Sequence, residues 1–66
     1  MYISQHALER MIERNLTSND VMLTVEYGSV VNSKSNDTRV VLEIDGVCVV
    51  VTTGWEPCVI TAFKKY

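Results

Sequence analysis

One dipeptide constrains the fold of this chain more than any other feature: Asp45-Gly46, which separates two runs rich in Val, Leu and Ile. Asp-Gly between alternating residues is typical of a two-residue type I′ turn, so it predicts a β-hairpin formed by residues 39–44 and 47–53. A turn of this length also determines which residues face each other. The predicted pairs on the core face are Ile44 with Val47, Leu42 with Val49, and Val40 with Val51.

The alternation of strand side chains predicts a second face on the same hairpin, which we call the reverse face. Its predicted pairs are Val41 with Val50, Glu43 with Cys48, and Arg39 with Thr52. An antiparallel sheet can pack one face on a core and leave the other in contact with water. We therefore expect the reverse face to stay partly open and accessible to a ligand.

The residues before the hairpin have helical spacing. Ser4 is a suitable N-cap because its hydroxyl can accept from a free backbone N–H, which predicts a helix over residues 5–14. Asn15 tolerates the left-handed conformation that ends such a helix. The predicted buried arc of this helix is Ala7, Leu8, Met11 and Ile12, with His6 and the charged residues on the opposite arc.

A second helix is predicted to begin after Thr17. Thr17 and Asp20 stand at the N-cap and N3 positions of a capping box, and the acid suits the positive end of the helix dipole. Gly28 stands where a left-handed glycine commonly ends a helix. The predicted buried side of this helix is Val21, Met22 and Val25.

The rest of the chain completes the predicted sheet. Residues 29–32 are predicted to form a short first strand, residues 33–38 a polar loop, and residues 58–63 the last strand. The order α-α-β-β-β-β predicts an α+β fold, with two N-terminal helices packed on one face of a four-stranded antiparallel sheet. Residues 1–66 are expected to form a single domain because a chain of this size builds only one core.

Composition and charge exclude several classes of protein. Eight acidic and six basic residues give a net charge of −2, so the chain is not a strongly basic nucleic-acid module. The sequence shows neither a membrane-spanning apolar run nor a signal peptide. Cys48 and Cys58 lie too far apart in the predicted hairpin to form a disulfide. We therefore expect a cytoplasmic protein with reduced thiols, and the sequence contains no motif for a metal ion or a cofactor.

Three short motifs resemble a known family. They are His6-Ala7-Leu8-Glu9-Arg10-Met11, Thr17-Ser18-Asn19-Asp20-Val21, and Val59-Ile60-Thr61-Ala62-Phe63-Lys64. Together they resemble a family of small bacterial domains catalogued as a domain of unknown function, number 4258. Asn15 stands where that family commonly has Gly, and Asn is the next-best residue for a left-handed position.

The helix-helix-sheet order, with a basic residue after an aromatic one in the last strand, is also similar to the wider RelE, MqsR and BrnT superfamily. Those proteins are toxins of toxin–antitoxin pairs, and they cleave RNA without a metal ion. The resemblance therefore implies an RNA substrate, an antitoxin protein as partner and no cofactor. Fold likeness does not by itself establish function.

Metal-independent RNA cleavage requires a base for the 2′-hydroxyl, cations for the phosphate and an acid for the leaving oxygen. His6 is the candidate base because imidazole titrates near neutral pH, and Arg10, one helical turn later, is the candidate phosphate ligand. Lys64, which ends the last strand, is the third candidate catalytic residue. The candidate RNA-binding residues are Arg39, Lys65 and Tyr66. Lys64 and Lys65 face opposite sides of the strand, so only one of them can point into a site on the reverse face.

These candidates also have structural interpretations. His6 could be a solvated surface residue, the two lysines could be solubilising residues, and Arg39 could form a cross-strand pair with Glu43. Trp55 is the candidate partner-binding residue, and its alternative role is to pack over the end of the core. The competing function is therefore a non-catalytic interaction domain that forms a homodimer or binds a partner protein.

Overall fold

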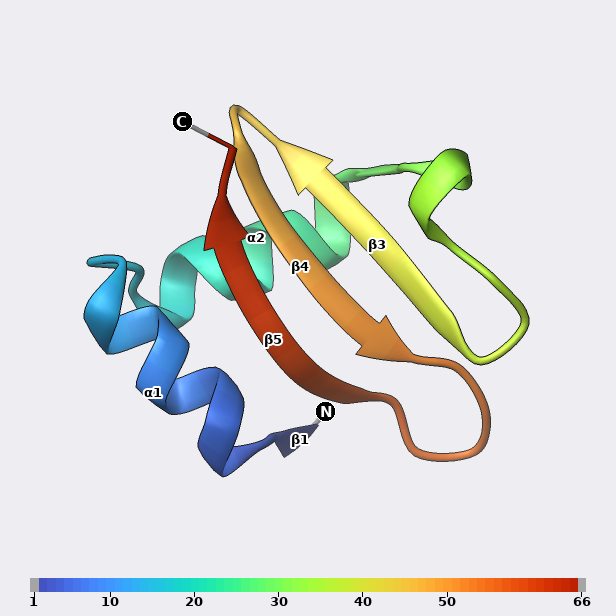
Figure 1. Ribbon diagram of the computed structural model, residues 1–66, viewed down its shortest axis with the longest axis horizontal. Helices are drawn as coiled ribbons and strands as arrows, with labels where there is room; N and C mark the ends of the chain where they lie inside the picture. The colour runs from blue at the N-terminus through green and yellow to red at the C-terminus, as the bar shows by residue number, and fades with distance from the viewer. Residues whose placement is uncertain (1, 66) are drawn as a thin grey trace.

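The computed structural model of this protein describes residues 2–65, which form two helices and a five-stranded sheet (Figure 1). In chain order the elements are β1 (Tyr2–Ile3), α1 (Gln5–Glu13), α2 (Ser18–Tyr27), β2 (Ser29–Val30), the 3-10 turn η1 (Asn32–Lys34), β3 (Arg39–Ile44), β4 (Val47–Thr52) and β5 (Cys58–Lys64). The predicted order of two helices followed by a hairpin and a last strand is therefore confirmed.

The hairpin around Asp45-Gly46 has the predicted register. β3 and β4 are antiparallel, and the structure confirms the pairs Ile44–Val47, Leu42–Val49 and Val40–Val51. Asp45 and Gly46 have φ angles of 49° and 84°, the left-handed values that a type I′ turn requires. Turn chemistry and strand alternation, both local features, thus determine the centre of the sheet.

The sheet has one strand more than predicted. Its strand order is β1-β5-β4-β3-β2, and β1 runs parallel to β5 while the other neighbours are antiparallel. The prediction of a four-stranded antiparallel sheet was therefore wrong, because Tyr2–Ile3 is too short to show an alternating pattern. Backbone bonds hold this strand in place: the Tyr2 N–H donates to the Pro57 carbonyl (3.3 Å) and the Ser4 N–H to the Val59 carbonyl (3.0 Å).

Both helices pack against one core but in different places. α2 crosses the core face of β4 and β3, whereas α1 lies alongside β5 near the edge of the sheet (Figure 1). The core consists of Ala7, Met11, Leu16, Val21, Val49, Val51, Val59 and Ala62, with partly buried Ile3, Val25, Val40, Leu42 and Val47 packed against it. The predicted core face of the hairpin is therefore the face that the helices cover.

The helices bury fewer apolar side chains than predicted. α1 buries Ala7 and Met11, but Leu8 is exposed and Ile12 is 78% exposed. A helix that lies along a single strand at the sheet edge covers only a narrow stripe, so the wide apolar arc predicted for α1 was wrong. In α2 the buried position next to Val21 is Thr24 rather than Met22, and the Thr24 hydroxyl donates to the Asp20 carbonyl (2.8 Å).

The predicted helix ends are mostly confirmed. The Ser4 hydroxyl accepts from the Ala7 N–H (3.1 Å), and Asn15 has a φ of 57°. Thr17 and Asp20 form the complete capping box. Gly28 differs from the prediction: its backbone is extended (φ −69°, ψ 156°), not left-handed. Glycine is needed there for space, because a Cβ atom would overlap the Thr24 carbonyl oxygen and lie 3.1 Å from the Glu43 carbonyl oxygen.

The reverse face is only partly open. Val41 and Cys48 in its centre are 5% and 2% exposed, whereas Arg39 at the start of β3 is exposed. The loop that contains η1 lines the β3 side: the Val31 N–H donates to the Val41 carbonyl (2.8 Å). Lys34 extends from η1 toward β5, where its Nζ atom lies 5.8 Å from the centre of the Phe63 ring. The accessible part of this face is therefore its rim, not its centre.

Candidate functional site

His6 and Arg10 form a pair on the exposed surface of α1. The Arg10 Nε–H donates to His6 Nε2 (3.5 Å), and Arg10 Nη1 forms an ion pair with Glu13 Oε2 (2.9 Å). The i,i+4 and i,i+3 spacings of a helix bring these three side chains together. The sequence predicted this proximity, and the capped start of α1 at Ser4 fixes the helical phase of all three residues.

The contacts of this pair determine what it can do chemically. Because His6 Nε2 accepts a hydrogen bond, the proton of the neutral imidazole is placed on Nδ1. With the proton on Nδ1, the only acceptor of the neutral imidazole is Nε2, which the Arg10 Nε–H occupies. Nε2 can therefore accept another proton only when Arg10 turns away from it, and a guanidinium turned to a phosphate can hold it through two parallel N–H bonds. The ion pair with Glu13 engages only one Nη atom of Arg10, so donors remain for an anion.

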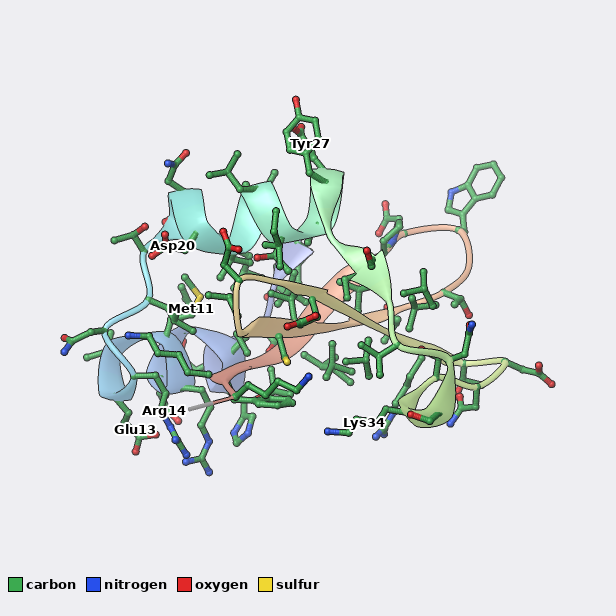
Figure 2. All side chains as sticks on the ribbon, turned by 90° about the horizontal axis from the view of Figure 1, so that it is seen from above. Met11, Glu13, Arg14, Asp20, Tyr27 and Lys34 are labelled. Carbon is green, nitrogen blue, oxygen red and sulfur yellow. The ribbon has the colours of Figure 1, made fainter. Side chains whose placement is uncertain are left out.

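Charged residues at the end of α1 lie on the side of the sheet opposite α2, which we call the reverse side. Figure 2 shows Glu13, Arg14 and Lys34 on the reverse side, while Asp20 and Tyr27 of α2 lie on the other. Arg10 belongs with the first group because it is ion-paired to Glu13. Sequence reasoning missed both Arg14 and Lys34. Arg14 lies four residues after Arg10 and could have been found from helical spacing, but Lys34 lies in a polar loop that carries no such signal.

Arg39 adds another cation to the reverse side. Its position opposite Thr52 places it on the reverse face, and it is exposed. The predicted alternative, a pair with Glu43, is not formed. Both residues lie on β3, and Glu43 Oε2 accepts from the Gly46 N–H (3.2 Å) at the hairpin turn. Within residues 2–65, the Arg10–Glu13 contact is the only ion pair.

The structure separates Lys64 from the His6–Arg10 pair. Lys64 lies opposite Val47, whose side chain packs on the core, so Lys64 points to the α2 side of the sheet. Its charge acts there on Asp20: the backbone N–H and the hydroxyl of Thr17 lower the pKa of this carboxyl below 3.8, and Lys64 contributes in the same direction.

Lys65 and Tyr66, the two residues after Lys64, are candidate RNA-binding residues. The Lys65 N–H donates to the Gly46 carbonyl (2.6 Å), which ties the end of β5 to the hairpin turn. Tyr66, the remaining candidate RNA-binding residue, lies outside the described residues.

Charge is therefore distributed unevenly over the molecule. The reverse side has the basic residues Arg10, Arg14, Lys34 and Arg39 together with the acidic Glu13 and Glu43, whereas α2 contains Asp20 and Glu26 and is faced by Lys64. Four of the six basic residues of the chain therefore share one side, where Glu13 and Glu43 offset part of their charge. A one-sided distribution of this kind can attract a polyanion although the net charge opposes it.

Trp55 does not cover the core. Its side chain is 97% exposed, so the packing role does not fit the structure. Tyr2, Trp55, Glu56 and Pro57 line a hollow of about 440 Å³ at the end of the sheet where β1 and β5 begin. The sequence singled out Trp55 but gave no indication that Tyr2 lies beside it.

Within residues 2–65, no group of three or more His, Cys, Asp or Glu side chains is placed so that it could hold a metal ion. Over the same residues, neither α1 nor α2 has the length and apolar character needed to cross a membrane. Cys48 is buried, Cys58 is half-buried, and both are free thiols.

Comparisons with known proteins give one match. Residues 3–64 match the family model described as "Domain of unknown function (DUF4258)". The match spans nearly every element from β1 to β5, including the His6–Arg10 pair. Neither the curated proteins nor the solved structures contain a significant match to this chain.

Proposed function

We propose that this chain, which belongs to the DUF4258 family, is a metal-independent RNA-cleaving domain similar to the RelE, MqsR and BrnT toxins. The observation that carries the proposal is the exposed His6–Arg10 pair, in which Arg10 Nε lies 3.5 Å from His6 Nε2. The pair combines a proton acceptor with a phosphate ligand on the side of the sheet that also contains Arg14, Lys34 and Arg39.

The proposed reaction is an intramolecular displacement at phosphorus. Arg10 turns from His6 to the phosphate, which frees His6 Nε2 to remove the proton of a ribose 2′-hydroxyl. The oxygen of this hydroxyl attacks the adjacent phosphorus. The bond from phosphorus to the 5′-oxygen breaks, and this oxygen leaves with a proton taken from water. The products are a 2′,3′-cyclic phosphate and a 5′-hydroxyl. Arg10 stabilises the negative charge that builds up on the phosphate oxygens.

The remaining cations are proposed to hold the RNA backbone. Arg14, Lys34 and Arg39 present positive charge around the rim of the reverse face, and contacts of this kind bind nucleic acid without regard to sequence. Because the rim of this face is exposed and its centre is buried, we expect an RNA strand to run along the rim. An antitoxin protein that covers the same rim would keep the domain inactive.

Expression in bacteria tests this function. We expect growth arrest with degradation of cellular RNA, and we expect His6→Gln and Arg10→Ala to abolish both effects. Lys64→Ala is the matched comparison because Lys64 lies on the α2 side, so this variant should retain most of the toxicity. Normal growth and intact RNA with a folded, expressed wild-type chain would contradict the proposal.

A second candidate function is an interaction domain that forms a homodimer through its α2 side. It is favoured by the apolar side chains Met22, Leu23, Tyr27 and Val30, all of which are exposed. Val30 lies on β2, the strand at one end of the sheet order, so a second copy could pair with this edge. A small domain also gains stability when a partner covers apolar surface.

Dimerisation is tested by the melting temperature as a function of protein concentration. We expect it to rise with concentration, and Leu23→Asp should remove the dependence while the fold is kept. A monomer at every concentration, together with intact RNA in the expression test, would exclude both candidate functions.

A further inference from the structure

The hollow beside Trp55 combines two aromatic side chains with a carboxylate. Tyr2 and Trp55 are both strongly exposed, and Glu56 and Pro57 complete the lining. The volume of about 440 Å³ is more than enough for a single side chain. Tyr2 lies near the start of the chain and the other three lining residues lie near its end. Neither His6 nor Arg10 lines the hollow.

Backbone contacts hold both walls of the hollow in place. The Tyr2 N–H donates to the Pro57 carbonyl (3.3 Å), which fixes β1 against the turn that contains Trp55. The base of that turn is fixed as well, because the Cys58 N–H donates to the Thr52 hydroxyl (2.9 Å). Gly54 has a φ of 110°, a value that favours glycine. This backbone conformation sets the direction of the chain between the end of β4 and Trp55. The backbone on both sides of the hollow is therefore fixed, while the exposed Trp55 and Tyr2 side chains are accessible to a ligand.

The chemistry of the lining selects the charge of the occupant. The faces of aromatic rings attract cations, and Trp is the strongest of the aromatic side chains in this respect. Glu56 adds a negative charge, and none of the four lining residues is basic. A phosphate would be repelled by this carboxylate, so a nucleic acid is the less suitable occupant. A guanidinium or an ammonium group has the charge that suits both the carboxylate and the aromatic rings.

We propose that this hollow binds the basic side chain of a partner protein, with Arg as the preferred residue. The planar guanidinium stacks on Trp55 or Tyr2 and pairs with Glu56. Trp, Tyr and Arg are also the residue types most enriched among those that dominate the binding energy of protein–protein interfaces. The proposal does not depend on RNA cleavage, because the hollow and the His6–Arg10 pair have no residue in common.

A fluorescence titration tests the proposal directly, because Trp55 is the only tryptophan of the chain. The probe is N-acetyl-arginine amide, and N-acetyl-citrulline amide is the neutral probe of matched shape. At constant ionic strength we expect a saturable change with the arginine probe, with an affinity on the order of millimolar, as suits one side chain. The citrulline probe should give only the linear quenching that free N-acetyl-tryptophan amide also shows.

Variants locate the binding to the hollow. Glu56→Gln removes the charge but keeps the shape, and Tyr2→Leu removes one ring; each should weaken binding about two- to fivefold. Glu9→Gln, an exposed acid on α1, is the control and should bind as the wild type does. Equal responses to both probes, tighter binding of uridine monophosphate, or an unchanged affinity of Glu56→Gln would each overturn the proposal.

Discussion

Gly28→Ala tests the junction between α2 and the sheet. Replacing a glycine of negative φ by alanine ordinarily stabilises a protein by about 0.4–1 kcal/mol, because the unfolded chain loses freedom. Gly28 has a φ of −69°, so backbone conformation alone predicts stabilisation. The close contacts around Gly28 predict destabilisation instead.

The neighbours of the added methyl group set the size of the effect. A Cβ atom on Gly28 would overlap the Thr24 carbonyl oxygen and lie 3.1 and 3.2 Å from the Glu43 carbonyl oxygen and nitrogen. All three atoms belong to the backbone. The last turn of α2 must change to relieve the contact with Thr24, and Gly28 must move away from β3 to relieve the contacts with Glu43. Forcing a methyl group into a packed site costs about 1–3 kcal/mol. After the gain from the unfolded chain is subtracted, we expect a net destabilisation of about 1–2 kcal/mol.

Urea unfolding measures this difference. The midpoint of Gly28→Ala should fall while the slope stays that of the wild type, because the surface exposed on unfolding is unchanged. Ser29→Ala, at the neighbouring exposed position on β2, is the control and should stay within about 0.5 kcal/mol of the wild type. An unchanged or higher stability of Gly28→Ala would refute the close approach of α2 and β3.

Three further predictions concern the core, the capping box and the hollow. Val49 is fully buried between the sheet and the helices, so Val49→Ala should lower the free energy of unfolding by about 2–3 kcal/mol; a loss below about 1 kcal/mol would contradict this packing. In the folded protein, Thr17 lowers the pKa of Asp20. The Asp20 carboxylate therefore stabilises the fold above pH 3.8, and this stabilisation is lost as the pH falls through the lowered pKa of the folded protein. In urea titrations Asp20→Asn should therefore lose the part of the acid sensitivity due to this carboxylate; an identical pH profile would argue against the capping box. Trp55→Ala should leave stability within about 0.5 kcal/mol, because the side chain is 97% exposed, and a larger loss would show that it packs on the domain.

Features encoded in neighbouring residues could be predicted from the sequence. The Asp45-Gly46 turn and the alternation around it gave the correct register of β3 and β4. The Thr17–Asp20 capping box gave the start of α2. In the same way, the four-residue spacing of His6 and Arg10 predicted their contact. In each case, the residues that determine the feature lie within a few positions of one another in the sequence.

Features that depend on contacts between distant segments could not be predicted in this way. Tyr2–Ile3 becomes a strand only because β5 is present as a template. Ile12 is exposed because α1 lies at the edge of the sheet, a position that helical periodicity does not specify. The approach of Lys34 to Phe63 likewise requires η1 to fold toward the reverse face.

Lys64 is an intermediate case. Strand alternation showed that Lys64 and Lys65 face opposite sides, and the position of Lys64 opposite Val47 then places it on the α2 side. Extending the hairpin register to the last strand would be needed to decide from the sequence which side Lys64 faces. The register between β4 and β5 is irregular between Val50 and Val51, and sequence alternation does not reveal such an irregularity.

Incubation of the purified chain with end-labelled RNA in the presence of EDTA tests the central proposal most directly. We expect the wild type to cleave the RNA and leave 2′,3′-cyclic phosphate ends, and we expect His6→Gln to be slower by at least about 100-fold, the usual contribution of a general base. Intact RNA with the folded wild-type chain, or equal rates for wild type and His6→Gln, would contradict the assignment of His6 and Arg10 as the catalytic pair.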